Sequence, residues 1–186
     1  MNFPILTLIT FTPLLGAILV LLIPREREDV IRRLSIVISF IPLVLAAVLW
    51  FSYDQTRGGI QFEQVVEWIP AIGVRYHMGV DGISVPLIFL TALLSTLSYF
   101  YSAYTIKKQV KEYYFFFMLL QVGMSGVFVS LDFILFYVFW EIGLVPMYFL
   151  IGIWGGERRI YAAIKFFLYT LVGSVAMLLA ILFVYF

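Results

Sequence analysis

The sequence has no cysteine and only one histidine, His77. Without thiols, the chain cannot form a disulfide, hold an iron–sulfur cluster or carry out thiol catalysis. A lone histidine cannot complete a metal site, so we interpret His77 as a surface or interface residue rather than a ligand. Phosphate-binding glycine loops, GxSxG turns and HExxH pairs are missing as well. The sequence therefore contains no sign of a redox, metal or hydrolytic centre.

Charge is also scarce. Charged residues make up 12% of the chain and leave a formal net charge of +1, which offers no attractive field for nucleic acid. Apolar residues, in contrast, make up 63%, and the mean hydropathy is +1.05. This composition excludes a soluble globular domain and indicates a protein that lies in the lipid bilayer.

Six apolar stretches are long enough to cross a bilayer as helices, because roughly 20 residues at ~1.5 Å each match a ~30 Å hydrocarbon core. They cover residues 3–23, 31–51, 81–103, 113–130, 132–151 and 161–186. The first is not a cleavable signal peptide, since it lacks a basic n-region and its charges follow it at residues 25–29. The sequence predicts an all-α integral membrane protein with six transmembrane helices.

Lysine and arginine positions predict the orientation of these helices. Nine of them fall in the loops after the first, third and fifth stretches: Arg25, Arg27, Arg32, Arg33, Lys107, Lys108, Lys111, Arg158 and Arg159. The opposite side has only Arg57 and Arg75. Because cytoplasmic loops carry the excess of basic residues, we expect the first set in the cytoplasm and the N-terminus outside.

The long outer loop, residues 52–80, is the one sizeable hydrophilic segment and carries a hairpin signal. Residues 61–68 and 73–77 have strand propensity, and they flank a turn signal at residues 70–73. A two-stranded hairpin alone is marginally stable. We therefore expect a short outer-face β-hairpin that lies on the membrane domain or on a partner subunit.

Glu141 lies at the middle of the fifth apolar stretch, far from either water layer. An ionised carboxylate there costs on the order of several kcal/mol, so it must be protonated, paired or hydrated. We favour a proton-relay role; the alternative is a protonated carboxyl that merely holds helices together. Five residues later, Pro146 removes a backbone donor, which predicts a helix kink just after the acid.

Lys165 lies about one turn inside the sixth stretch, followed by Tyr169 and Thr170 as further candidates for a hydrated relay path. About 15 Å of helix separates Glu141 from the cytoplasmic end, against ~5 Å for Lys165, so we expect no direct salt bridge. Two interpretations of Lys165 stay open: a side chain that reaches back to the interface, or a water-linked partner of Glu141.

Several polar residues elsewhere in the chain can be interpreted in two ways. Gln121 and Ser125, one turn apart in the fourth stretch, could hydrogen-bond neighbouring helices or line a hydrated path. Asp81 and Asp132 precede the third and fifth helices, where a carboxylate meets free amides and the positive end of the helix dipole. We interpret both as N-caps; a proton-exit role for Asp81 is the less favoured alternative.

These residues together have a familiar arrangement. The segments FWEIGLVPMY at 139–148, WGG at 154–156, AAIKFFLYT at 162–170 and DGIS at 81–84 resemble the antiporter-like proton-pumping membrane subunits of respiratory complex I. The resemblance is to chain M of bacterial NADH:quinone oxidoreductase, to mitochondrial chain 4 and to their counterpart in the photosynthetic NDH complex. It runs along essentially the whole chain.

The resemblance implies a subunit of an NADH (or ferredoxin):quinone oxidoreductase that pumps protons while quinone is reduced elsewhere. Glu141 and Lys165 correspond to the family's mid-membrane glutamate and sixth-helix lysine. NADH, FMN, iron–sulfur clusters and quinone would bind other subunits, so no cofactor is expected in this chain. Expected partners are other membrane subunits, including adjacent antiporter-like ones. The expected location is an energy-coupling membrane: the bacterial plasma membrane, or else the inner mitochondrial or thylakoid membrane.

Members of this family have about fourteen helices built around two inverted five-helix repeats. By this resemblance, residues 1–112 form an N-terminal three-helix region and residues 113–186 begin the first repeat. We therefore expect this chain to be the N-terminal part of a longer protein, without the next helix whose lysine pairs with the glutamate. Two other functions stay open: a subunit of a cation/proton antiporter, and a non-transporting structural membrane subunit.

Overall fold

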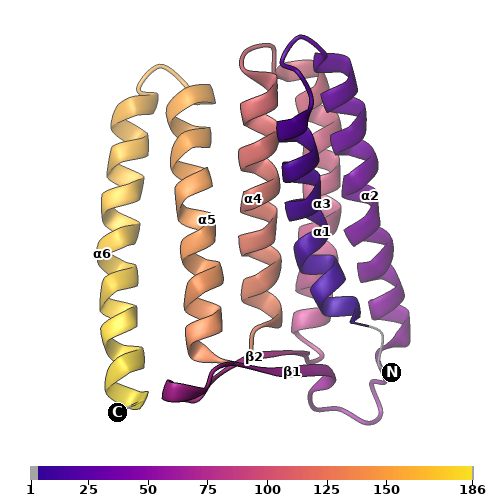
Figure 1. Ribbon diagram of the computed structural model, residues 1–186, viewed down its shortest axis with the longest axis vertical. Coiled ribbons are helices and arrows are strands. Elements are labelled where there is room, and N and C mark those ends of the chain that lie inside the picture. Colours follow the sequence, from indigo (N-terminus) through magenta and orange to yellow (C-terminus); the bar gives the residue numbers. More distant parts are fainter. Residues whose placement is uncertain (1–3, 186) are drawn as a thin grey trace.

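The computed structural model describes residues 4–185 and consists of six long helices and one β-hairpin (Figure 1). The helices are α1 (Ile5–Leu22), α2 (Glu28–Ser52), α3 (Ser84–Thr105), α4 (Val110–Val129), α5 (Phe133–Trp154) and α6 (Arg159–Tyr185). Strands β1 (Gln61–Ile69) and β2 (Val74–Val80) flank the 3-10 turn η1 (Pro70–Ile72). All six helices are long and apolar enough to cross a membrane, which confirms the six predicted spans.

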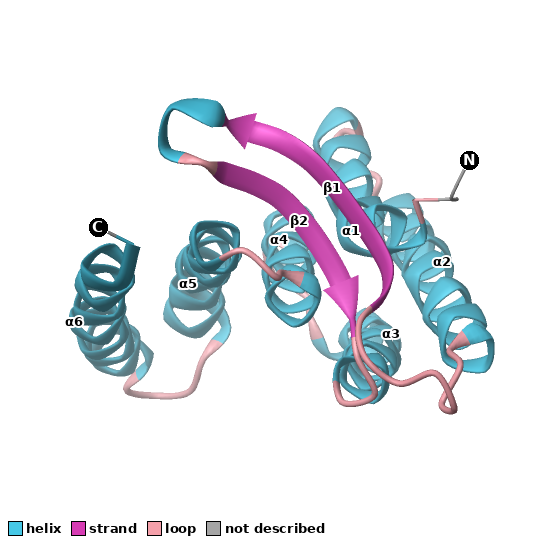
Figure 2. Ribbon diagram, turned by 90° about the horizontal axis from the view of Figure 1, so that it is seen from below, coloured by secondary structure: helices cyan, strands magenta, loops and turns pink. Residues whose placement is uncertain are grey.

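Consecutive helices run antiparallel, so the two ends of the bundle differ (Figure 1). The hairpin, the start of α1 and the end of α6 lie together at one end, here called the hairpin end. Short loops at residues 23–27, 106–109 and 155–158 lie at the other, here called the basic end. Seen along the helices, α1–α4 form a cluster and α5 and α6 extend it in a row (Figure 2).

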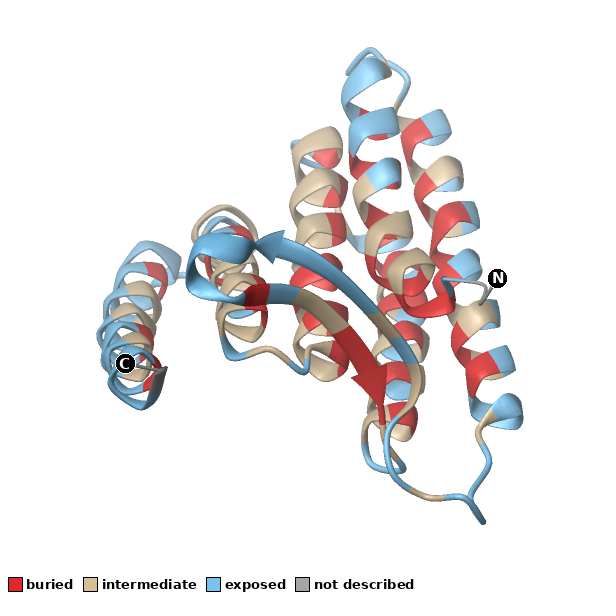
Figure 3. Ribbon diagram, turned by 60° about the horizontal axis from the view of Figure 1, so that its bottom comes forward, coloured by how far each residue is buried: buried red, intermediate tan, exposed pale blue. Residues whose placement is uncertain are grey.

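The buried core lies mainly among α1–α4 and under the hairpin, as Figure 3 shows. One apolar cluster, with Leu6, Met78 and Phe139 among its members, joins the hairpin to the helices near the hairpin end. A second, which includes Tyr99 and Tyr114, packs α1–α4 nearer the basic end. Helix α6 buries little of its surface in this chain.

Helices α4 and α5 approach each other closely because two glycines of α4 face α5. A Cβ at Gly123 would lie 2.8 Å from the backbone nitrogen of Gly143, and one at Gly126 would overlap the ring of Phe139. Lipid tails are as apolar as leucine, so packing of this kind, rather than a hydrophobic driving force, associates helices inside a membrane.

The hairpin lies on the membrane-spanning helices, as expected. The strands pair antiparallel, with Val65 opposite His77. The carbonyl of His77 accepts a hydrogen bond from the amide of Leu131 (2.9 Å), in the loop between α4 and α5. On the other side, the Thr7 hydroxyl of α1 lies 2.8 Å from the hydroxyl of Tyr76. These polar contacts give an otherwise marginal two-stranded sheet its support.

Both predicted aspartate caps are present. Asp81 accepts hydrogen bonds from the amides of Ser84 (2.7 Å) and Ile83 (3.0 Å) at the start of α3. Asp132 accepts from the amides of Ile134 and Leu135 at the start of α5. Backbone and side-chain hydrogen bonds from Ser84 hold the pKa of Asp81 below its ordinary value of 3.8, because they stabilise the ionised carboxylate.

At the basic end, two basic side chains donate hydrogen bonds to carbonyl groups at the C-termini of helices. Arg32 donates to the carbonyls of Ala103 (2.6 Å) and Ile106 (3.0 Å), at the end of α3. Lys111 donates to the carbonyls of Leu21 and Ile23, both at 2.8 Å, at the end of α1. Cations at helix C-termini satisfy carbonyls that have no intrahelical partner. These residues therefore have a structural role in addition to their effect on orientation.

Candidate functional site

Glu141 lies within α5, about 12 Å along the helix from its hairpin end and about 20 Å from its basic end. The helix begins at Phe133 because Asp132 caps it, and a continuous apolar run then carries it across the bilayer. It continues without a break through Pro146 to Trp154. The kink expected at that proline stays a prediction.

Contacts on either side show that Glu141 faces α6. Toward the basic end, the rings of Tyr148 and Phe167 lie 5.3 Å apart. Toward the hairpin end, Tyr137 of α5 lies near Ser174 of α6. Tyr137, Glu141 and Tyr148 are spaced four and seven residues apart and so share one face of α5. The half-buried Glu141 side chain therefore lies on the face of α5 that packs against α6.

The Glu141 carboxyl is incompletely satisfied. Its Oε1 is buried, and within the described residues 4–185 it has no hydrogen-bond partner. The Tyr137 hydroxyl, one turn away, is its polar neighbour on α5. A buried carboxyl oxygen without a partner costs free energy, so this oxygen is the atom open to a proton, a water molecule or a cation.

Lys165 does not pair with Glu141. Its ammonium lies over the ring of Tyr161, with Nζ 5.8 Å from the ring centroid, and its side chain is exposed on this chain. The α5–α6 contacts place it roughly 8–14 Å from the level of Glu141 along the helices. The described residues include no ion pair for either group.

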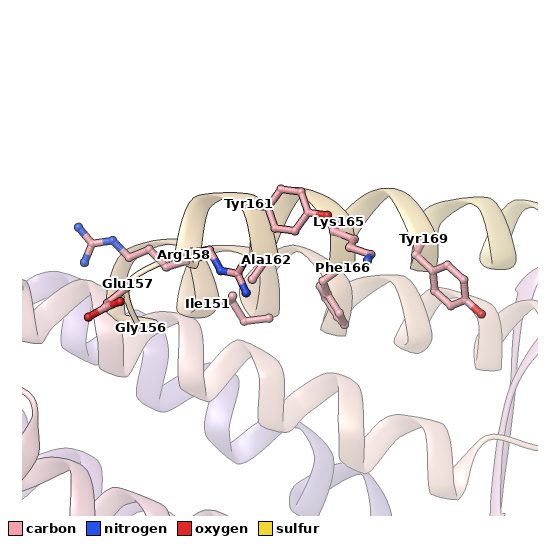
Figure 4. Close-up of a pocket in the computed structure, with 10 residues that line it drawn as sticks. Ile151, Gly156, Glu157, Arg158, Tyr161, Ala162, Lys165, Phe166 and Tyr169 are labelled. Atoms are coloured by element: carbon pink, nitrogen blue, oxygen red, sulfur yellow. The ribbon is translucent and has the colours of Figure 1, made fainter.

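Lys165 lines an open groove of about 710 Å³ beside the α5–α6 turn (Figure 4). Tyr169 lines the same groove one turn farther along α6 and is 84% exposed. Thr170 lies instead on an apolar groove of about 670 Å³, which Thr91 of α3 and Trp140 of α5 also line. The structure thus places the three α6 candidates on two different surfaces.

Gln121 and Ser125 lie apart from Glu141, in the core of the α1–α4 cluster. Gln121 is 1% exposed, and its Oε1 accepts a hydrogen bond from the Tyr99 hydroxyl of α3 at 3.1 Å. Its Nε2 has no partner among the residues the structure describes. The Tyr99 bond is the interhelical contact that one of the two interpretations expects. A hydrated path through this residue stays a prediction.

The structure therefore brings together a set that the sequence did not single out: Glu141 with Tyr137 and Ser174. Tyr137 is four residues before the acid, a spacing that places two side chains on one helix face, and this signal was available in the sequence. Ser174 required the α5–α6 register. Groups of three or more potential metal-ligating residues are absent from the described part of the chain.

Six apolar helices, an end hairpin and a carboxyl within a span define an integral membrane protein. Residues 5–130 match the family described as NADH-ubiquinone oxidoreductase chain 4, amino terminus. Residues 130–186 match the family described as NADH:quinone oxidoreductase/Mrp antiporter, TM. The chain belongs to the NADH-ubiquinone oxidoreductase chain 4 family.

Individual relatives agree with this assignment. The chain is 41% identical over 180 residues to NAD(P)H-quinone oxidoreductase chain 4 2 of Thermosynechococcus vestitus, covering 96% of this chain and 34% of the relative. It is 39% identical to NADH-quinone oxidoreductase subunit M of Rickettsia prowazekii, covering 100% and 38%. A chain in the respiratory complex I structure from Thermus thermophilus superimposes with a TM-score of 0.81 at 28% identity, covering 95% and 35%. The chain thus spans about a third of these relatives.

Proposed function

We propose that this chain is part of a proton-translocating membrane subunit of a redox-driven quinone oxidoreductase. The observation that carries the proposal is the Glu141 carboxyl, held between α5 and α6 at membrane depth with a buried oxygen that lacks a partner. A residue that cannot ionise would hold helices together at lower cost. The membership of the NADH-ubiquinone oxidoreductase chain 4 family supplies the redox context.

In this proposal Glu141 alternates between a neutral protonated state and an ionised state. Loss of the Glu141 proton is favourable while a cation lies near the carboxylate. When the cation moves away from the carboxylate, protonation of Glu141 becomes favourable again. Lys165 is too distant for a direct pair, so it takes part through intervening water, toward the basic end. The conformational cycle that moves the cation follows quinone reduction elsewhere in the complex.

The wider setting is part of the same proposal. NADH, flavin, iron–sulfur clusters and quinone bind other subunits, and the partners of this chain are the membrane subunits beside it. The basic end faces the cytoplasm or the equivalent compartment, which places the N-terminus outside. The membrane is an energy-coupling one, with the bacterial plasma membrane favoured.

A transport assay on vesicles that contain the assembled complex, with the full-length subunit, separates this function from the two alternatives. Quinone reduction should drive proton transport in the wild type, and Glu141→Gln should abolish transport while the complex still assembles. Glu157→Gln, in the exposed α5–α6 turn, is the matched control and should transport normally.

The alternatives give different results in the same vesicles. Proton exchange driven by a sodium gradient, without a redox substrate, would indicate a cation/proton antiporter subunit. Unchanged transport and unchanged quinone reduction in both Glu141→Gln and Lys165→Ala would indicate a structural membrane subunit. Either result would overturn the proposal.

A further inference from the structure

We propose that the groove between the start of α1, the end of α2 and β1 binds the headgroup of phosphatidylethanolamine, a phospholipid with one phosphate and one primary ammonium group. The groove has a volume of about 670 Å³, which is in the range of pockets that hold small molecules. Glu141 does not line it. The inference therefore goes beyond the proposed function and does not depend on it.

The groove lies at the boundary between the hydrocarbon core of a membrane and its headgroups. Ile5 begins α1, and Val48 lies about one turn before α2 ends at Ser52. The other lining residues belong to the loop after α2 and to β1. Val48 and Ile60 are exposed, so apolar surface is left uncovered beside polar groups. A phospholipid has the same order of polarity, with acyl chains next to a charged headgroup.

Hydrogen bonds fix the loop that presents Arg57 to this groove. The Gln61 side chain pairs with both backbone groups of Asp54: it accepts from the amide at 3.1 Å and donates to the carbonyl at 2.7 Å. The Asp54 carboxylate accepts from the Thr56 hydroxyl (2.6 Å) and from the amides of Thr56 and Arg57. Side chains thus close this turn on itself, and Arg57 lies within it.

The Arg57 guanidinium is the group that would bind the phosphate. It is exposed and forms no ion pair within residues 4–185. Arginine and phosphate form two parallel charge-assisted hydrogen bonds, a geometry that lysine cannot reproduce. Gln64 lines the same groove, and its Oε1 accepts a hydrogen bond from Thr7. The NH₂ of Gln64 is therefore left to donate to a second phosphate oxygen.

Glu63 would bind the ammonium group. Its carboxylate is exposed, and Oε1 lies 3.8 Å from Nε2 of His77, beyond hydrogen-bond distance. An ionised carboxylate only accepts, and a primary ammonium donates three hydrogens. Arg57 and Glu63 together give the groove one positive and one negative charge. This pair matches a zwitterionic headgroup with N–H donors. The quaternary ammonium of phosphatidylcholine has no N–H to donate, and an anionic lipid without an ammonium group would be repelled by Glu63.

Photochemical labelling of the assembled complex, with the full-length subunit, tests the proposal. The complex is placed in nanodiscs of phosphatidylcholine that contain a small fraction of phosphatidylethanolamine with a photoreactive acyl chain. Mass spectrometry then locates the labelled peptides. The wild type should be labelled within residues 48–64. Arg57→Ala should lower this labelling by about tenfold, because a charge-assisted contact with the phosphate is lost.

Matched variants separate specific binding from a general effect of charge. Arg75→Ala removes the same charge from the same end of the bundle but lies outside the groove, so its labelling should equal that of the wild type. Glu63→Gln should abolish the preference for the phosphatidylethanolamine probe over a phosphatidylcholine probe with the same photoreactive chain. Glu67→Gln, on the same strand and outside the groove, should keep that preference.

Three results would overturn the proposal. The first is equal labelling of residues 48–64 in the wild type and in Arg57→Ala, or no labelling there in the wild type. The second is equal labelling of the wild type by the two probes, which would indicate a general lipid contact. The third is competition by excess glycerophosphoethanolamine, which has the headgroup without acyl chains and would indicate a site for a soluble ligand. Proton transport is not measured in this experiment, so its failure would leave the proposed function of Glu141 untouched.

Discussion

The surroundings of Asp81, Asp132 and Glu141 separate two structural carboxyl groups from a functional candidate. Asp81 and Asp132 each accept two backbone hydrogen bonds at a helix start, where amides are free. Glu141 lies about two turns inside α5, where every amide is already used by the helix. Its buried Oε1 lacks a partner among residues 4–185. A carboxyl that serves only packing would have been satisfied.

The Asp81 cap has a pH dependence whose sign follows from its hydrogen bonds. Its pKa in the folded protein is below the ordinary value of 3.8, chiefly because Ser84 donates to the carboxylate. The cap therefore stabilises the fold above that value, and this contribution is lost as the pH falls through the folded pKa. We expect faster amide exchange at the start of α3 below about pH 4, relative to intrinsic rates.

Hydrogen exchange on the full-length protein, followed by mass spectrometry, tests this prediction. Asp81→Asn keeps a capping side chain without a titrating group, so its exchange at Ile83 and Ser84 should not change with pH beyond the intrinsic rate. If the wild type and this variant respond equally to acid, Asp81 is not the group responsible.

Single side chains were predictable only where their position along a helix determined their partners. Both aspartate caps followed from sequence, because a cap bonds amides two and three residues away. The contact of Tyr137 with Ser174 did not, since it depends on how α5 and α6 align. The same alignment separates Thr170 from Tyr169, which neighbour each other in sequence but line different grooves.

The helices and the hairpin were predictable because each is determined locally. Apolar length set the six spans, and every helix end lies within three residues of its predicted position. The turn signal at Pro70 predicted where the two strands of the hairpin are joined. Which helix packs against which was not predictable. These helices are apolar on all sides, and a side chain that faces lipid is as apolar as one that faces another helix. The clustering of α1–α4 is known only from the structure.

The contact between α4 and α5 depends on the absence of a side chain at Gly123. We predict that Gly123→Ala destabilises the full-length protein by about 1–3 kcal/mol, because its Cβ would meet the backbone of Gly143 at 2.8 Å and backbone cannot move aside. Thermal unfolding of the purified protein measures the effect.

Gly173→Ala on α6 is the matched control, since a Cβ there has no neighbour within 4 Å. It should be as stable as the wild type or slightly more stable, because alanine favours helix over glycine. Equal stability of the two alanine variants would contradict close packing of α4 against α5.

The orientation of the whole bundle can be tested because the chain has no cysteine. A cysteine at Ala71, in the exposed turn of the hairpin, should react with a membrane-impermeant maleimide on intact cells. A cysteine at Glu157, in the exposed α5–α6 turn, should react only after permeabilisation. Other cysteines of the full-length protein would first be replaced. The reverse pattern would place the basic end outside and contradict the predicted orientation.

The proton-to-electron ratio of the assembled complex tests the central claim most directly. Protons moved and quinone reduced are counted in the same vesicles, for the wild type and for Glu141→Gln in the full-length subunit. The account predicts a ratio near zero in the variant, because the carboxyl that must exchange protons has become an amide that cannot. A ratio equal to that of the wild type, in a fully assembled complex, would contradict it.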